Sequence, residues 1–168
     1  MLLVAIVRFA GLAAVALTAF AFPRFAAARE MQGRVGLGYN SEFQNSTTTQ
    51  RVPAVSLKYG LTRDIAVEGL FGIASTSPAN TIIGAKFFKN LLYETNLNYY
   101  FMLGGGILSA SGNSGGQFLG GFGVEFFVPG LESLGFSFEV GASIDTLSGM
   151  TVRTLGASFL DAGMHFYF

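Results

Sequence analysis

Alternation of apolar and polar residues with a period of two is the feature that most constrains what this chain can fold into. Across residues 136–145 one face of an extended chain carries Phe, Phe, Val, Ala and Ile, and the other carries Ser, Glu, Gly, Ser and Asp. Residues 93–104 alternate in the same way. Successive side chains of a β-strand point to opposite faces, so this pattern predicts strands, whereas a helix would mix the two classes on every face.

The pattern divides the chain after residue 28 into eight such segments joined by short, turn-forming stretches. Short connections favour antiparallel hairpins, and no linker or second domain interrupts residues 29–168. The predicted strands are 31–43, 51–60, 65–75, 80–88, 93–109, 115–127, 135–145 and 152–168.

The scarcity of charge decides which face of these strands meets water. Charged residues make up 12% of the chain, about half the usual share for a globular domain. The apolar face is broad and aromatic, while the polar face is small and rich in glycine and serine. This inverts the pattern of a soluble sandwich and is typical of a barrel with lipid outside, since only a closed sheet pairs all its backbone groups in lipid. We therefore predict an all-β fold, an eight-stranded antiparallel up-and-down transmembrane β-barrel.

The first 28 residues are predicted to be a cleaved signal peptide. Residues 9–22 are apolar or small and uncharged, which is too short for a membrane-spanning helix but suits the core of a signal. Arg8 precedes this run, and Ala26 to Ala28 supply small residues for a cleavage site after residue 28. No later apolar run approaches 18 residues.

Each predicted strand places one charged residue on its polar face. Isolated charges in a dry interior would be very costly, so we expect these residues to pair in a salt-bridge network that fills the barrel. An alternative is a narrow, weakly cation-selective conduit, because carboxylates outnumber cations. Arg153 is a further candidate cation in the last segment, where a bulge would change the alternation. The eight residues are Arg34, Lys58, Glu68, Lys86, Glu94, Glu125, Glu139 and Asp161.

The last eight residues, 161–168, follow a polar, x, Gly, x, x, aromatic, x, aromatic pattern. It resembles the closing-strand signal of bacterial outer-membrane β-barrel proteins, with Asp161, Gly163, Phe166 and Phe168 at its defining positions. The architecture of residues 31–168 is similar to small eight-stranded OmpA-like and OmpX-like barrels. This resemblance implies a cell outer-membrane location among lipid and lipopolysaccharide. It also implies handling by periplasmic chaperones and the barrel-assembly machinery, which would capture the last strand by strand addition.

Residue types argue against most kinds of chemistry. The chain has no Cys and a single His, His165, so neither a metal site nor a bound cofactor is expected. Ten basic and ten acidic residues exclude a strongly basic nucleic-acid binder. No nucleophile stands out beside the carboxylates, and no catalytic residue is predicted.

A structural or accessory-subunit role in the outer membrane is the function these observations favour. The alternatives are a narrow pore for ions or small solutes and, second, an enzyme that modifies lipid A. Short outer connections disfavour large ligands, while the outward-facing small residues Gly69, Gly120 and Ala142 would allow close approach by another envelope protein.

Overall fold

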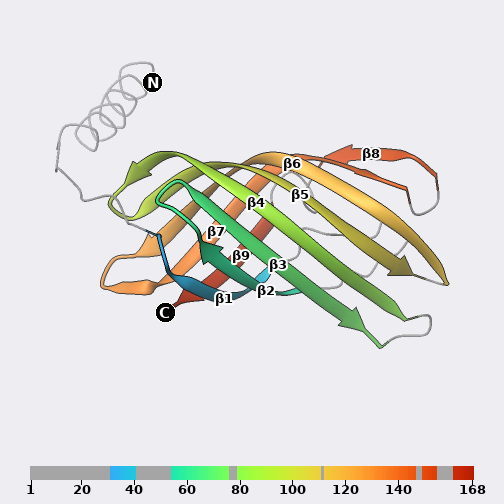
Figure 1. Cartoon of the computed structure of the whole chain (residues 1–168), viewed down its shortest axis with the longest axis horizontal. Helices are drawn as coiled ribbons and strands as arrows, with labels where there is room; N and C mark the ends of the chain where they lie inside the picture. The colour runs from blue at the N-terminus through green and yellow to red at the C-terminus, as the bar shows by residue number, and fades with distance from the viewer. Residues whose placement is uncertain (1–30, 41–53, 76–78, 111, 147–148, 155–160) are drawn as a thin grey trace, which may run out of the picture.

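The chain forms one antiparallel β-sheet that closes on itself (Figure 1). The computed structural model describes residues 31–40, 54–75, 79–110, 112–146, 149–154 and 161–168. The predicted signal segment, 1–28, and the predicted connection 44–50 lie outside the described residues. The strands are β1 (Val35–Asn40), β2 (Ala54–Gly60), β3 (Ile65–Ala74), β4 (Asn80–Glu94), β5 (Leu97–Ala110), β6 (Asn113–Val128), β7 (Leu131–Asp145), β8 (Thr151–Thr154) and β9 (Asp161–Tyr167).

Pairing between consecutive strands builds the wall, and β9 closes it. Each of β1 to β6 pairs antiparallel with the strand that follows it in sequence. The last strand, β9, pairs with β7 on one side and with β1 on the other. The result is a closed eight-stranded antiparallel barrel without helices in the described residues, which confirms the predicted all-β architecture.

The eighth predicted strand, 152–168, is described as two pieces. The short β8 pairs with the far part of β7, and β9 pairs with the near part. Glu139 and Ala142 are three positions apart on β7, yet their partners Asp161 and Thr154 are seven apart. The strand opposite β7 therefore changes register by four residues between β8 and β9.

Two of the stretches predicted to connect strands, 89–92 and 128–134, are wrong because the strands run further than the alternation suggested. β4 continues through 89–92 to Glu94, with a bulge between Asn90 and Leu92 that interrupts the alternation. The hairpin to β5 then turns within 95–96. The β6–β7 hairpin likewise turns at Pro129–Gly130 rather than over 128–134, and Gly130 adopts the positive φ of 83° that favours glycine.

Glycines let large side chains fill the barrel interior. A Cβ added to Gly36 would lie 2.6 Å from the Tyr167 ring, and one added to Gly123 would lie 2.7 Å from the Tyr100 ring. Each of these tyrosines lies directly opposite its glycine on the neighbouring strand. At these two positions, therefore, glycine allows a large side chain to pack beside a small residue inside a narrow barrel.

An apolar cluster occupies part of the interior. Its side chains come from β2 to β6, and the least exposed, Met102, has no accessible surface. Phe88 and Tyr100 pack edge to face within it, with ring centroids 5.2 Å apart. The cluster consists of Ala54, Ala66, Leu70, Ile82, Phe88, Tyr100, Met102, Leu108 and Leu119.

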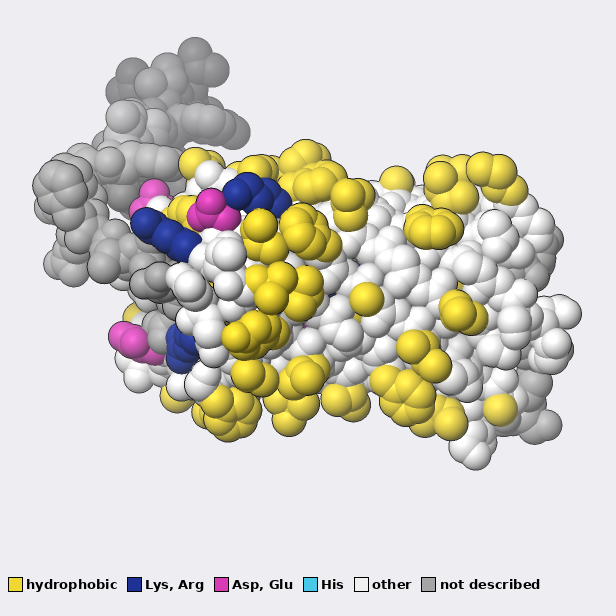
Figure 2. All heavy atoms as spheres, in the orientation of Figure 1, with side chains coloured by type: hydrophobic (Ala, Val, Ile, Leu, Met, Phe, Trp, Pro, Cys, Tyr) yellow, Lys and Arg dark blue, Asp and Glu magenta, His cyan; other side chains and the backbone are white. Residues whose placement is uncertain are grey.

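The outer face of the wall is apolar. Alternate residues along β2 (Val55, Leu57 and Tyr59) point outward and are 41–59% exposed. Figure 2 shows hydrophobic side chains over the visible side of the barrel, with charged side chains only at one end. We call this end the base; it contains the beginning of β1, the end of β9 and the β2–β3, β4–β5 and β6–β7 connections (Figure 1).

Candidate functional site

The interior charges lie in the half of the barrel nearer the base. Period-two alternation along neighbouring strands directs them inward. Six of the eight predicted residues are buried, and Arg34, just before β1, is half-buried. The buried six are Lys58 on β2, Glu68 on β3, Lys86 on β4, Glu125 on β6, Glu139 on β7 and Asp161 on β9.

Two lysines form ion pairs across the interior. Lys58 Nζ donates to Glu125 Oε2 at 3.0 Å, which joins β2 to β6. Lys86 Nζ lies 3.3 Å from Glu68 Oε2 on the neighbouring strand and 3.2 Å from Glu139 Oε2 on β7. The Lys58–Glu125 and Lys86–Glu139 bridges connect strands that do not pair with one another, so they link separate parts of the wall across the interior.

Phe88 packs against both ammonium groups. The Lys58 Nζ lies 4.4 Å from the centre of its ring, and the Lys86 Nζ lies 5.2 Å from it. A cation over an aromatic face is attracted by the ring quadrupole, most strongly where water is excluded. The aromatic ring therefore stabilises two buried charges while it fills the lumen.

His165 links two of the carboxylates. Its Nε2 lies 2.8 Å from Ser56 Oγ and 3.0 Å from Glu68 Oε1, and its Nδ1 lies 3.9 Å from Glu125 Oε1. Hydroxyl donors complete the arrangement: Tyr167 donates to Glu125, and Tyr100 donates to Glu139 Oε1 at 2.5 Å. We call Ser56, Lys58, Glu68, Lys86, Tyr100, Glu125, Glu139, His165 and Tyr167 the interior network.

Carboxylates outnumber the lysines of the interior network. Lys58 and Lys86 face three glutamates within the interior network, which leaves one carboxylate in excess. The imidazole of His165 lies between two of these carboxylates, those of Glu68 and Glu125.

Two predicted residues border the network. The Arg34 guanidinium lies 5.8 Å from the centre of the Tyr167 ring. Asp161 is buried beside Glu139, its partner across β7 and β9, and its Oδ1 accepts a hydrogen bond from the backbone of Ala162 at 3.0 Å.

The prediction that Glu94 faces the interior is wrong. Glu94 is the last residue of β4 and is exposed at the base, because β4 runs through the predicted connection and its bulge shifts the alternation. Arg153, the further candidate cation, lies on β8, away from the network. Its Nε lies 3.6 Å from Asp145 Oδ2 and donates to Ser143 Oγ at 3.3 Å.

The residues of the predicted insertion signal occupy β9 and the position after it. Asp161 and Gly163 face inward, while Phe166 and Phe168 point outward with 43% and 72% exposure. The two outward rings pack edge to face, 5.2 Å apart. Phe168 also donates its backbone N–H to Val35 at 2.9 Å, which extends the contact between β9 and β1.

Alternation could have indicated Ser56, since it lies two residues before Lys58 on the same face. The Ser56–His165 contact is the arrangement expected of a nucleophile and its base. Both residues are only 1% exposed, however, and Glu68 contacts the same imidazole nitrogen as the serine. No cluster of potential metal ligands occurs among the residues that the structure describes.

No protein-family model and no curated protein sequence matches this chain. Within the described ranges, no helix is long and apolar enough to cross a membrane.

Proposed function

We propose that this chain is an integral barrel of the bacterial outer membrane with a structural or accessory-subunit role, and that it is neither a pore nor an enzyme. The observation that carries the proposal is a filled interior inside an apolar wall. In this proposal residues 1–28 direct export and are removed. The surroundings of the barrel are outer-membrane lipid, lipopolysaccharide and other envelope proteins.

The outer wall supports insertion into lipid. Large apolar side chains project outward from β1 to β7 and from β9. Exposed charges of the described chain, such as Arg63, Glu94 and Glu132, lie at the base rather than along the wall. A water-facing sheet would carry charges between its apolar residues, whereas a lipid-facing sheet cannot.

The interior supports a non-conducting role. Leu70, Leu108 and Leu119 belong to the apolar cluster and are at most 4% exposed, so a hydrated ion would meet hydrocarbon rather than water. Toward the base, the small cavity beside Lys58 and Tyr167 measures about 10 Å³, at the lower limit for a single water molecule. Burial of Ser56 and His165 likewise leaves no surface on which a lipid substrate could react.

Conductance tests this proposal. The purified protein in planar bilayers should give no steady current steps. Replacing Leu70, Leu108 and Leu119 together with serine should produce a small steady current in folded protein, because the change removes three large apolar side chains of the cluster. The matched control replaces three outward residues, Ile73, Ile107 and Phe118, with serine and should stay silent. A steady, salt-dependent current from the unaltered protein would overturn the non-conducting role.

The exposed aromatic residues of the last strand should be needed for assembly. In the proposed outer-membrane setting, the Phe168→Ser variant should reach the periplasm but yield several-fold less folded barrel. The reason is that the assembly machinery would lose an apolar contact on the strand it captures. Folded protein is measured as the fraction that resists SDS without boiling. Tyr39→Ser, an outward aromatic on β1 that is 47% exposed, is the control. Equal losses in both variants would contradict a special role for Phe168.

A further inference from the structure

A cationic corner lies at the base, between the β2–β3 connection and the end of β4. Lys89 Nζ donates to Asp64 Oδ2 at 3.1 Å. The Tyr93 hydroxyl lies within hydrogen-bonding reach of the Asp64 carboxylate and of the Arg63 carbonyl oxygen, 3.0 Å away. The Arg63 guanidinium lies 5.2 Å from the centre of the Tyr93 ring. We call Arg63, Asp64, Lys89 and Tyr93 the base corner.

The base corner carries a net positive charge. The hydrogen bonds from Tyr93 and Lys89 lower the pKa of the Asp64 carboxyl, so this group stays ionised at neutral pH. One carboxylate therefore opposes two cations. Arg63 is exposed and forms no ion pair with any residue of the described ranges. Its planar guanidinium can bind a phosphate through two parallel hydrogen bonds.

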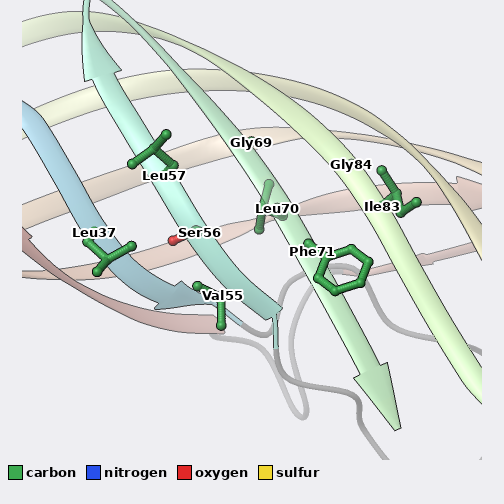
Figure 3. A pocket seen from close by; sticks show the side chains of 9 residues that line it. All are labelled: Leu37, Val55, Ser56, Leu57, Gly69, Leu70, Phe71, Ile83 and Gly84. Atoms are coloured by element: carbon green, nitrogen blue, oxygen red, sulfur yellow. The ribbon is translucent and has the colours of Figure 1, made fainter.

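An apolar depression of about 440 Å³ lies on the outer wall over β1 to β4 (Figure 3). Gly69 forms part of its floor, because no atom lies within 4 Å of where its Cβ would be. Leu57, Phe71 and Ile83 project around it in Figure 3. The full lining is Leu37, Val55, Ser56, Leu57, Gly69, Leu70, Phe71, Ile83 and Gly84.

The base corner and the depression lie on the same strands. Lys89 is paired with Ile65, and Gly69 is paired with Ala85, four residues further along each strand. Four residues of strand span about 13 Å. One leaflet of a bilayer has a hydrocarbon thickness of roughly 15 Å, half of the total core. Between the two features lie Val67 and Phe87, which are exposed and apolar.

We propose that this face binds one anionic glycerophospholipid. Arg63 and Lys89 hold its phosphate, and one of its acyl chains crosses Val67 and fills the depression at Gly69. The inference rests on the proposed insertion into a membrane. Net positive charge selects the anionic headgroup, and the separation of about 13 Å along the tilted strands lies within the reach of an acyl chain that spans one leaflet.

Tryptophan quenching tests the site, since the chain has no Trp of its own. In the Phe71→Trp variant the indole lies in the depression. Vesicles contain phosphatidylcholine and phosphatidylglycerol in equal amounts, with bromine on the acyl chains of one lipid at a time. A net charge of one at the surface predicts a roughly fivefold preference for the anionic lipid. Bromine on phosphatidylglycerol should therefore quench this Trp more strongly.

Phe138→Trp on β7 is the matched control. Phe138 is 40% exposed on the outer wall. The exposed charged residue on the same strand, close to the β6–β7 turn, is Glu132, an anion. Bromine on phosphatidylglycerol should therefore quench this Trp no more strongly than bromine on phosphatidylcholine. Adding Arg63→Gln and Lys89→Gln to Phe71→Trp should remove the preference while quenching itself remains.

Equal quenching of Phe71→Trp by the two lipids would overturn the lipid site, as would a preference that survives the double glutamine substitution. Both results leave membrane insertion intact. Absence of quenching at both tryptophans would instead overturn insertion, and with it this inference.

Discussion

The Lys86→Met variant should lose about 3–5 kcal/mol of unfolding free energy, because breaking a buried ion pair leaves uncompensated charge behind. Lys86 has a fully buried side chain and lies within 3.3 Å of both Glu68 and Glu139. Methionine fills a similar volume but leaves both carboxylates without this cation. Urea titration of the refolded protein in zwitterionic vesicles, followed by tyrosine fluorescence, measures the loss.

Two further variants separate charge from packing. Lys89→Met removes the ammonium of a side chain that is 45% exposed and paired with Asp64, so the urea midpoint should hardly move. Combining Lys86→Met with Glu68→Gln and Glu139→Gln removes the three charges together and should recover most of the stability. If the triple variant is as unstable as Lys86→Met alone, packing rather than charge accounts for the effect.

Period-two alternation was sufficient to predict which face carries the network. It placed Lys58, Glu68, Lys86, Glu125 and Glu139 inside from single-strand patterns, and these residues are buried. An inward direction depends only on a residue's own strand, which a local pattern describes. The error at Glu94 arose where a bulge changed that pattern without a glycine or proline to mark it.

Contacts across the lumen could not be predicted in this way. Lys58 and Glu125 are 67 residues apart on strands that do not pair, and His165 reaches Ser56 from 109 residues away. These distances depend on the registers of all the intervening hairpins and on the closure between β9 and β1. A single strand contains no information about either. The sequence therefore indicated the members of the network but not its ion pairs.

The pairing of β6 with β7 should depend on Gly121 more than on any exposed glycine of the wall. Gly121 is buried and lies opposite Gly141. An added Cβ would collide with the Val140 carbonyl oxygen and would lie 2.8 Å from the Gly141 Cα. Both obstacles are backbone atoms of the neighbouring strand, so no rotamer change can relieve them. The Gly121→Ala variant should lose about 3 kcal/mol or more, and the fraction that folds should fall.

Gly69→Ala is the matched control on the outer wall, and its effect should have the opposite sign. No atom lies within 4 Å of the added methyl group there. Alanine also loses less conformational freedom than glycine on folding, which favours this variant by about 0.5–1 kcal/mol. The urea midpoint should therefore rise slightly for Gly69→Ala and fall strongly for Gly121→Ala. Equal destabilisation of both would mean that strand flexibility, rather than close backbone approach, is what these glycines supply.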